Sequence, residues 1–309
     1  MIKYLFNRIW QAVIVLIGVT LVTFILLNVA PGDPVLVMLQ KRADQATVER
    51  VRHELGLDRP LYVQYFDFVG KAVQGDLGKS YFQKTPVLEM LNNGFKVTVK
   101  IGGLALVVSI GFGLIMGTLA ALFRGKLIDR VLMFIAMLGV SAPIFWIAVI
   151  MQIIFGLQLK WLPISGMKDP RWLIMPVLVL GFNYGAAAAR LIRTNMLDAL
   201  GQDYVRTARA KGVGEGLVVA KHVLKNAAIP IVTLTGMQLR SMLTGAMVLE
   251  TVFSLNGLGK ITFAAISARD IPIIQGSVLY SAVLYVVINL IVDLLYGVLD
   301  PRIRITKGA

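Results

Sequence analysis

Residues 75–80 read Gly-Asp-Leu-Gly-Lys-Ser, which ends like the loop that binds nucleotide phosphates in ATPases. That loop needs a glycine, four further residues and then Gly-Lys-Ser or Gly-Lys-Thr. Here the residue five positions before Gly78 is Val73, and valine does not freely adopt the backbone angles of glycine. The preceding residues 62–74 have the apolar spacing of an amphipathic helix, whereas a phosphate loop follows a strand. We therefore predict a glycine-rich loop here and no nucleotide site.

A second stretch with chemical potential is 201–230, GQDYVRTARAKGVGEGLVVAKHVLKNAAIP. Asp203 can cap a helix that Gly212 would end, and a second helix follows at about 215–227. Ala208 and Gly212 are four residues apart, so they share a helix face and leave a shallow depression. The flanking side chains are basic, namely Arg206, Arg209 and Lys211. The stretch is either a solvated positive loop or a docking surface that small residues let a partner approach closely.

The composition places these stretches in a membrane protein. The 309 residues are 57% hydrophobic and 16% charged, with a mean hydropathy of +0.76, whereas soluble domains carry about 25% charged residues. The chain has no cysteine, and His53 and His222 lie far apart, so no metal-ligand spacing occurs. The net charge of +14 fits basic loops at a membrane surface better than nucleic-acid binding.

Six apolar stretches approach the roughly 20 residues that a bilayer-spanning helix needs. They are 9–30, 97–123, 131–157, 173–189, 229–253 and 272–299. The first follows Lys3 and Arg8, as a secretory signal would, but it is longer than the roughly 7–15 apolar residues of a signal and lacks a cleavage site. We predict an all-α membrane protein with six transmembrane helices.

The basic residues predict that both termini are cytoplasmic. With that orientation the inner segments are 1–8, 124–130, 190–228 and 300–309. They hold 15 Lys and Arg residues, whereas the two short outer loops hold five. The outer segment 31–96 holds nine more, but long segments count little in this rule.

The outer segment 31–96 is predicted to contain two short helices. Two prolines in APGDP (30–34) end the first span. Thr47 can cap a helix that Gly56 ends, and Pro60 can begin a second one. The second helix has an apolar face, formed by Leu61, Tyr65, Phe68, Val69 and Ala72.

Small residues recur every four positions in the second and fourth predicted spans. They are Ser109, Gly113, Gly117 and Ala121, and then Gly181, Gly185 and Ala189. This spacing lets helices pack closely in lipid. It leaves open whether the contact is static or slides during transport.

Five ionisable residues lie within or near the predicted spans. Lys100, Arg190 and Glu250 fall near span ends, where snorkelling or a contact at the interface is expected. Arg240 and Asp293 lie deeper, and either could line a polar path or pair structurally.

Helix-breaking or polar residues also occur in these spans. Pro143 and Asn183 can interrupt helix regularity beside such a path, as can Pro230 and Pro272 at span starts. A kink without significance for transport remains open at each position.

The stretch 203–230 resembles the cytoplasmic loop of ABC-importer permeases, whose signature is Glu-Ala-Ala…Gly. Arg206-Thr207-Ala208 stands where Glu-Ala-Ala would, as is usual in the peptide and nickel branch of the family. Further stretches that resemble this branch are APGDP, LGLDRPLYVQY, GDLGKSYFQKTPV, WLPISG, ETVFSLNGLG, RDIPIIQG and NLIVDLLYGVLDPRIR. Asn256 departs from it, since proline is commoner there.

The resemblance implies a permease subunit and not an enzyme, in the cytoplasmic membrane of a bacterium or archaeon. Its partners would be a second homologous permease, two cytoplasmic ATPases that bind ATP and magnesium, and an extracytoplasmic binding protein. This chain itself would hold no cofactor or metal. Residues 1–30 would form the tail and first helix, 31–96 an outer insertion, and 97–309 a five-helix core.

The site residues carried over are those of an ATPase-docking loop and of a translocation path. The loop residues are Asp203, Arg206, Thr207, Ala208, Arg209, Lys211, Gly212 and Glu215, and the path residues are Pro143, Asn183, Arg240 and Asp293. The expected cargo is di- or oligopeptides, with nickel, a metal chelate or glutathione as alternatives. An ion-coupled secondary transporter and a membrane scaffold are more remote.

Overall fold

The computed structural model describes residues 2–29, 32–39 and 44–299. Over these residues the chain is helical, and its β pairing is limited to an isolated bridge between Lys79 and Pro86. The chain divides into two compact units, Met1–Lys96 with Asn256–Ala309 and Val97–Leu255. One boundary between the units falls within the long helix α5 (Val87–Leu122), and the other falls between Leu255 and Asn256.

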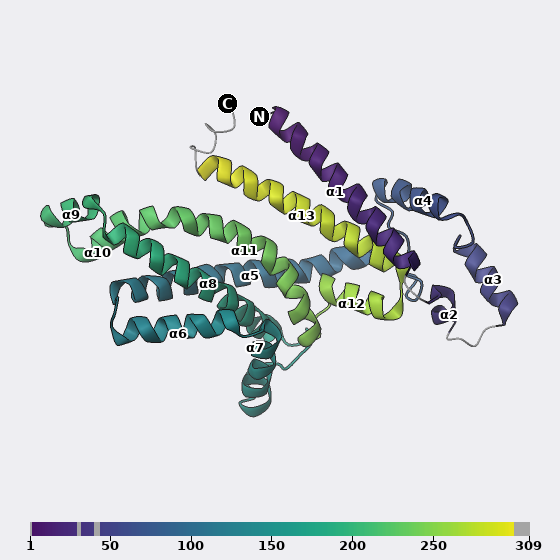
Figure 1. The fold of residues 1–309 in the computed structure, drawn as a ribbon. Helices are drawn as coiled ribbons and strands as arrows, with labels where there is room; N and C mark the ends of the chain where they lie inside the picture. The colour runs from purple at the N-terminus through teal and green to yellow at the C-terminus, as the bar shows by residue number, and fades with distance from the viewer. Residues whose placement is uncertain (1, 30–31, 40–43, 300–309) are drawn as a thin grey trace. The chain divides into compact units, whose positions relative to one another are not determined.

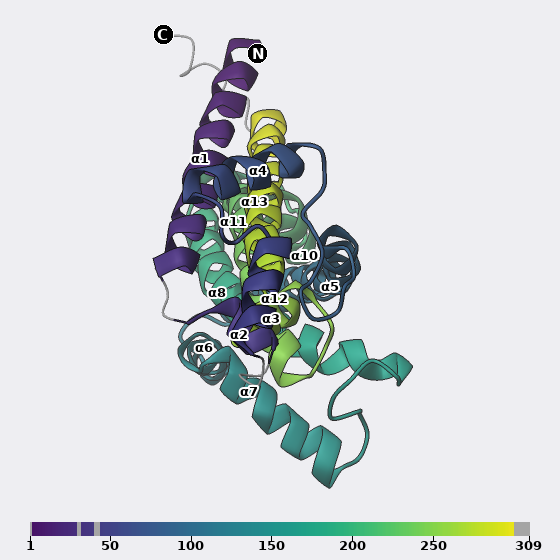
Figure 2. The ribbon, with the colours of Figure 1, turned by 90° about the vertical axis from the view of Figure 1, so that its right-hand side faces the viewer.

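The first unit contains the helices nearest the two chain ends. Its elements are α1 (Ile2–Val29), α2 (Pro34–Met38), α3 (Gln45–Glu54), α4 (Leu61–Val73), the start of α5 (Val87–Leu122), α12 (Leu258–Ala268) and α13 (Ile271–Leu299). Helices α1 and α13 pack side by side and run in opposite directions (Figures 1 and 2). The first residues of α1 and the last of α13 therefore lie at the same end of the pair.

The second unit is built around α8. Its elements are the rest of α5, α6 (Leu127–Ser141), α7 (Ile144–Met151), the π-helix η1 (Gln152–Gln158), the 3-10 helix η2 (Pro170–Leu173), α8 (Ile174–Leu200), α9 (Asp203–Ala210), α10 (Glu215–Leu217), the π-helix η3 (Val218–Val223) and α11 (Leu224–Val252). Helices α6, α7 and α11 all pack against α8.

The predicted third span, 131–157, is wrong as a single straight helix. The chain bends by 106° between α6 and the continuous helix formed by α7 and η1 (Figure 2). The break falls at Pro143, which precedes α7, because proline lacks the N–H of a continuing helix and disfavours helical angles in the residue before it.

Four described helices are long and apolar enough to span a membrane, or five if the bent pair counts as one span. They lie in α1, α5, α8 and α13. The remaining predicted span, 229–253, falls in α11, where several side chains lie outside the described part of the chain. The count of six thus stays a prediction.

Several predicted boundaries need correction. Helix α5 begins at Val87 and not at 97, and α8 continues to Leu200, beyond the predicted end at 189. Helix α3 is capped by Asp44, whose side chain accepts a hydrogen bond from the Thr47 backbone N–H, and not by Thr47 itself. The end of α3 near Gly56 and the start of α4 after Pro60 are as predicted.

Glycines bring α5 and α8 into close contact, as the spacing of small residues predicted. A Cβ on Gly117 would lie 2.6 Å from the Ala189 carbonyl oxygen, and one on Gly113 would lie 2.7 Å from the Ala188 Cβ. From the other side, a Cβ on Gly185 would lie 3.1 Å from the Ser109 carbonyl oxygen. Real side chains do not fit at these distances, so the two backbones touch where glycine stands.

We expect Gly117→Ala to lower the melting temperature of the purified protein in detergent, because overpacking costs about 1–3 kcal/mol. Gly103→Ala on the same helix is the matched control, since an added Cβ there meets no atom within 4 Å. Alanine also favours helix over glycine by about 1 kcal/mol, so this control should not lower the melting temperature. Equal melting of the Gly117 variant and wild type would contradict the close contact.

Candidate functional site

The predicted docking segment forms helix α9, which is followed by a tight turn. Gln202 occupies the N-cap without a side-chain hydrogen bond, so the predicted capping role of Asp203 is wrong; Asp203 lies in the first turn. There its negative charge favours the helix N-terminus. Gly212 ends the helix with φ of +76°, a left-handed conformation that suits glycine.

One face of α9 is buried in the second unit. Val205 is fully buried and Ala208 is 6% exposed, and both belong to a cluster that includes Ile192, Val218 and Val223. The predicted depression shared by Ala208 and Gly212 is therefore wrong, because the Ala208 side chain packs inside the chain. Its small size lets α9 lie close to α8 and η3.

The opposite face of α9 and its turn is exposed and carries three basic side chains, those of Arg206, Arg209 and Lys211. Its described residues are Tyr204, Arg206, Thr207, Arg209, Lys211 and Gly212. A helix with a buried apolar face and an exposed basic face can present its charges to an acidic partner without exposing its apolar residues.

An ion pair fixes the direction of one of these charges. The Arg209 guanidinium donates to both carboxylate oxygens of Glu215, at 2.9 Å and 2.5 Å. This hydrogen bonding lowers the pKa of Glu215 and raises that of Arg209. Arg206 lies 3.5 Å from Asp203, in an exposed pair of adjacent helical turns. The Arg209–Glu215 pair thus closes the turn that contains Lys211 and Gly212.

The predicted path residues are brought together only in part. The Asn183 side-chain amide of α8 donates to the Gly139 carbonyl of α6 at 2.8 Å, four residues before Pro143 and the break. Both residues thus belong to the α6–α8 contact. The side chains of Arg240 and Asp293 lie outside the described residues, although their backbones belong to α11 and α13.

Sequence reasoning misplaced a buried carboxylate. Glu250 is fully buried, and the Thr98 hydroxyl donates to its carboxylate at 2.5 Å, so the predicted snorkelling is wrong. The bond joins α5 to α11. The short ETVF stretch after an apolar run was the available signal, but it does not show which face Glu250 occupies.

Two further polar links were missed. The Arg193 guanidinium of α8 donates to both oxygens of the buried Asp129 carboxylate of α6, at 2.6 and 2.8 Å. The Ser109 hydroxyl of α5 donates at 3.0 Å to the side chain of Gln238 in α11, which in turn donates to the Tyr184 carbonyl. Each link connects helices that are distant in sequence, which is why no local pattern predicted it.

The stretch 75–80 is a structural loop, as predicted. It follows helix α4 and not a strand. The Ser80 hydroxyl donates to the buried Asp270 carboxylate at 2.5 Å, and the Tyr81 backbone N–H donates to the same carboxylate at 3.1 Å. Burial, with a smaller contribution from Asp270, raises the pKa of Tyr81 to about 12. The serine of the apparent phosphate motif therefore holds a loop.

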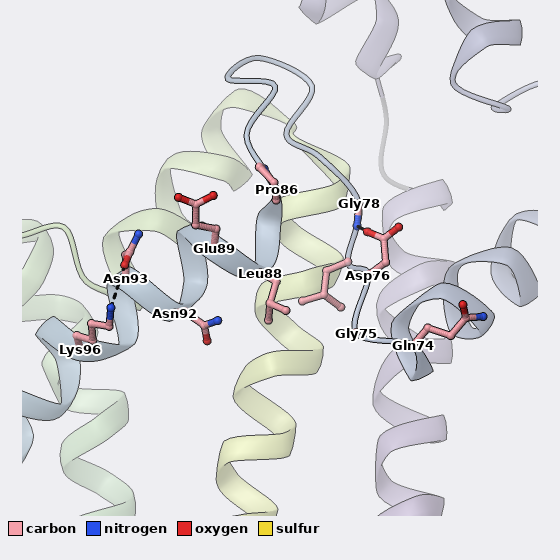
Figure 3. A pocket seen from close by; sticks show the side chains of 11 residues that line it. Gln74, Gly75, Asp76, Gly78, Pro86, Leu88, Glu89, Asn92, Asn93 and Lys96 are labelled. Carbon is pink, nitrogen blue, oxygen red and sulfur yellow. Dashed lines mark hydrogen bonds between the residues drawn. The ribbon is translucent and has the colours of Figure 1, made fainter.

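A groove of about 550 Å³ opens between residues 74–78 and the first turns of α5 (Figure 3). Leu88 and Asn92 face it from α5, and Asn93 accepts a hydrogen bond from Lys96 at the rim. Asp76 accepts from the Gly78 backbone N–H at 2.8 Å, which fixes the turn of the loop. The groove is thus an open surface feature of the first unit.

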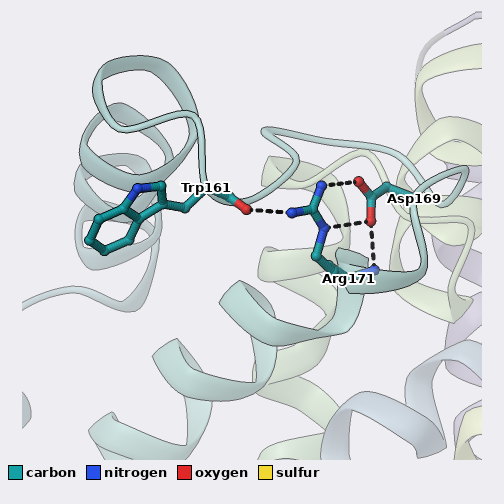
Figure 4. Close-up of polar contacts among 3 residues, drawn as sticks. All are labelled: Trp161, Asp169 and Arg171. Atoms are coloured by element: carbon teal, nitrogen blue, oxygen red, sulfur yellow. Dashed lines mark hydrogen bonds and ion pairs between the residues drawn. The ribbon is translucent and has the colours of Figure 1, made fainter.

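The loop after η1 is held by a forked ion pair (Figure 4). Arg171 donates to both carboxylate oxygens of Asp169 and to the Trp161 carbonyl. Hydrogen bonds from the Arg171 side chain and backbone lower the pKa of Asp169 to about 2. The Asp169 carboxylate therefore stays ionised, and its ion pair with Arg171 persists, through the physiological pH range.

Among the described residues, no group of three or more His, Cys, Asp or Glu could hold a metal ion.

Several described helices that are long and apolar enough to span a membrane indicate a multi-pass membrane protein. Residues 110–305 match the family described as binding-protein-dependent transport system inner membrane component, and residues 1–102 match the N-terminal family of such components. The chain belongs to this family of ABC-transporter permeases, which are not enzymes.

Relatives with known names extend over the whole chain. The di/tripeptide transport system permease DppB of Pseudomonas aeruginosa is 39% identical, over 98% of this chain and 99% of the relative. The glutathione transport system permease GsiC of Escherichia coli is 38% identical, with the same coverage. The inward-facing MetNI methionine ABC transporter matches with a TM-score of 0.59 at 17% identity, over 68% of this chain and 96% of that chain, and supports the fold alone.

We expect Asp270→Ala to release the loop at 75–86, because two hydrogen bonds to a buried carboxylate are lost. Bonds to charged groups contribute about 1.5–3 kcal/mol, so amide hydrogen exchange in this loop should rise about ten- to hundredfold. Lys79→Ala, in the same loop, should leave exchange unchanged, and the ATPase rate of the assembled transporter should stay within about twofold. Unchanged protection in the Asp270 variant would contradict the tether.

Proposed function

We propose that the chain is the translocating permease subunit of an ATP-driven importer for di- or oligopeptides. The names of two relatives, for di/tripeptide and glutathione transport, support a peptide-like cargo. Glutathione is itself a tripeptide, so it is the nearest alternative. Nickel or a metal chelate is a further alternative within the same branch.

The observation that carries the proposal is the construction of α9. Val205 and Ala208 fix the helix to α8 and η3, while Arg206 and Lys211 remain exposed. A partner ATPase that binds this basic face would push against a rigidly supported helix. Movement of α9 would then pass to α8 and, through the Asn183 and Arg193 links, to α6.

We infer the docking set to be Asp203, Arg206, Thr207, Arg209, Lys211, Gly212 and Glu215, with Ala208 as internal support. The path set remains Pro143, Asn183, Arg240 and Asp293. Asn183 is the best supported, since it lies beside the break between α6 and α7.

The proposed topology has six spans, with both termini in the cytoplasm and residues 31–96 as an extracytoplasmic insertion. The excess of basic residues in the inner segments supports this orientation, as does the common end of α1 and α13 (Figure 1). A second permease, two ATPases and a binding protein complete the importer in the inner membrane of a bacterium or archaeon.

We expect Arg206→Glu to insert normally but to lose the ATPase during co-purification, because it reverses an exposed charge on the docking face. The loss should be at least tenfold in retained ATPase, which corresponds to about 1.4 kcal/mol. Lys168→Glu reverses an exposed charge on the loop before η2 and is the matched control. Wild-type retention and uptake in the Arg206 variant would refute the docking assignment.

Uptake by the assembled importer in vesicles tests the function directly. We expect accumulation of a labelled dipeptide or tripeptide that needs ATP and the binding protein and survives a protonophore. Competition by unlabelled peptide, glutathione or nickel identifies the cargo class. Uptake that continues without ATP and collapses with the protonophore would instead indicate an ion-coupled transporter.

A further inference from the structure

Tyr184 of α8 and Ser241 of α11 form a polar pair between the two helices. The Tyr184 phenol interacts with the Ser241 side chain, and the Ser241 hydroxyl donates to the Met237 carbonyl at 3.3 Å. Behind the pair, the buried Gln238 donates to the Tyr184 carbonyl at 2.8 Å and accepts from the buried Ser109 hydroxyl at 3.0 Å. A series of hydrogen-bonding groups thus runs from the buried side of α11 to the exposed Ser241.

The polar pair lies near the middle of the membrane. Helix α8 begins at Ile174, ten residues before Tyr184, and α11 ends at Val252, eleven residues after Ser241. A backbone hydrogen bond between the loop before α8 and the residue after α11 keeps these two helix ends together. Measured along either helix, the pair lies about 15 Å from these ends. That distance is half of the apolar core of a bilayer, which is about 30 Å thick.

The exposed side of α11 at this level differs from the exposed sides of α5 and α6. On α11, Ser241 is exposed, and Met237, one turn away, is 58% exposed. In α5 (101–122) and α6 (131–140), the exposed described residues carry no hydrogen-bonding side chain. Aliphatic and aromatic side chains suit contact with lipid, whereas polar side chains within spans usually face the protein or a water-filled passage.

Helix α8 continues this polar surface toward α9. The exposed described residues of its first half, Ile174 and Leu178, are apolar. In its second half α8 exposes Arg190, Thr194 and Asp198, and their intervals of four place them on one side of the helix. Polar exposure therefore begins near the middle of the span and extends to the end of α8 that carries α9.

We propose that Tyr184 and Ser241 contact the cargo in the middle of the translocation path and hydrogen-bond to its peptide bonds. This inference rests on the proposed import of peptides. A phenol and a hydroxyl can each donate and accept, so together they match the N–H and C=O groups that all peptides share. Met237 beside them is flexible and adapts to cargo side chains of different shape. The bond from Gln238 to α8 holds the pair in place.

Single cysteines test whether the pair lines a water-filled path, because the chain has no cysteine of its own. In the importer in proteoliposomes, we expect Ser241→Cys to react about tenfold faster with a charged methanethiosulfonate than Val107→Cys does. A thiol in lipid does not ionise, and the thiolate is the reactive form. Val107 is 67% exposed and lies two residues from Ser109, which bonds to Gln238, so it is a control at the same depth.

Met237→Cys provides a second position on the same exposed side of α11. We expect it to react as fast as Ser241→Cys. If both variants react no faster than Val107→Cys, the path does not pass this side of α11 and the proposal is overturned.

Tyr184→Phe tests the contact with the cargo. We expect it to lower the maximal rate of tripeptide uptake about fivefold, the contribution of one hydrogen bond. ATP hydrolysis stimulated by the loaded binding protein should stay within about twofold, because the helix contacts of Tyr184 are kept. Tyr285→Phe removes an exposed phenol from α13 and is the matched control, with both rates unchanged.

Two results for Tyr184→Phe would overturn the contact. One is unchanged uptake, and the other is an equal loss of uptake and ATP hydrolysis, which would indicate a structural role. Absence of peptide uptake by the wild-type importer would instead refute the proposed function. The cysteine reaction rates do not depend on which cargo is imported, so the two failures are distinguishable.

Discussion

The backbone contact between α5 and α8 is the constraint on which the second unit depends. Lipid gives helices little hydrophobic reason to associate, so close packing must supply the attraction. Gly113, Gly117 and Gly185 remove the side chains that would hold the two helices apart. From this contact α8 continues to Leu200, and α9 begins three residues later at Asp203. The position of α9 is thus set by a contact made several turns away.

Buried polar pairs complete the arrangement that packing begins. Thr98 with Glu250 joins α5 to α11, and Arg193 with Asp129 joins α8 to α6. A polar group without a partner in the bilayer costs several kcal/mol, so each pair strongly disfavours other alignments of its helices. Such pairs add specificity more than stability, because burying them has its own desolvation cost. They connect α5 to α11 and α8 to α6 at points far apart in the sequence.

The first unit uses a different device. A single carboxylate, that of Asp270, holds the loop at 75–86 to the start of α13, and α13 packs along α1. The loop is thereby joined to the antiparallel pair of α1 and α13.

The sequence alone determined the class of fold and the family, because long apolar runs force helices in a bilayer and the RTARAKG stretch is specific. It also predicted the left-handed end of α9 at Gly212, since that is a local preference of glycine. Tertiary structure decided the 106° break at Pro143, because proline permits a kink without setting its angle. It likewise decided that Ala208 faces inward and that Ser80 meets Asp270, 190 residues away. Which face is buried, and which distant partner a polar group finds, depends on packing that no local pattern contains.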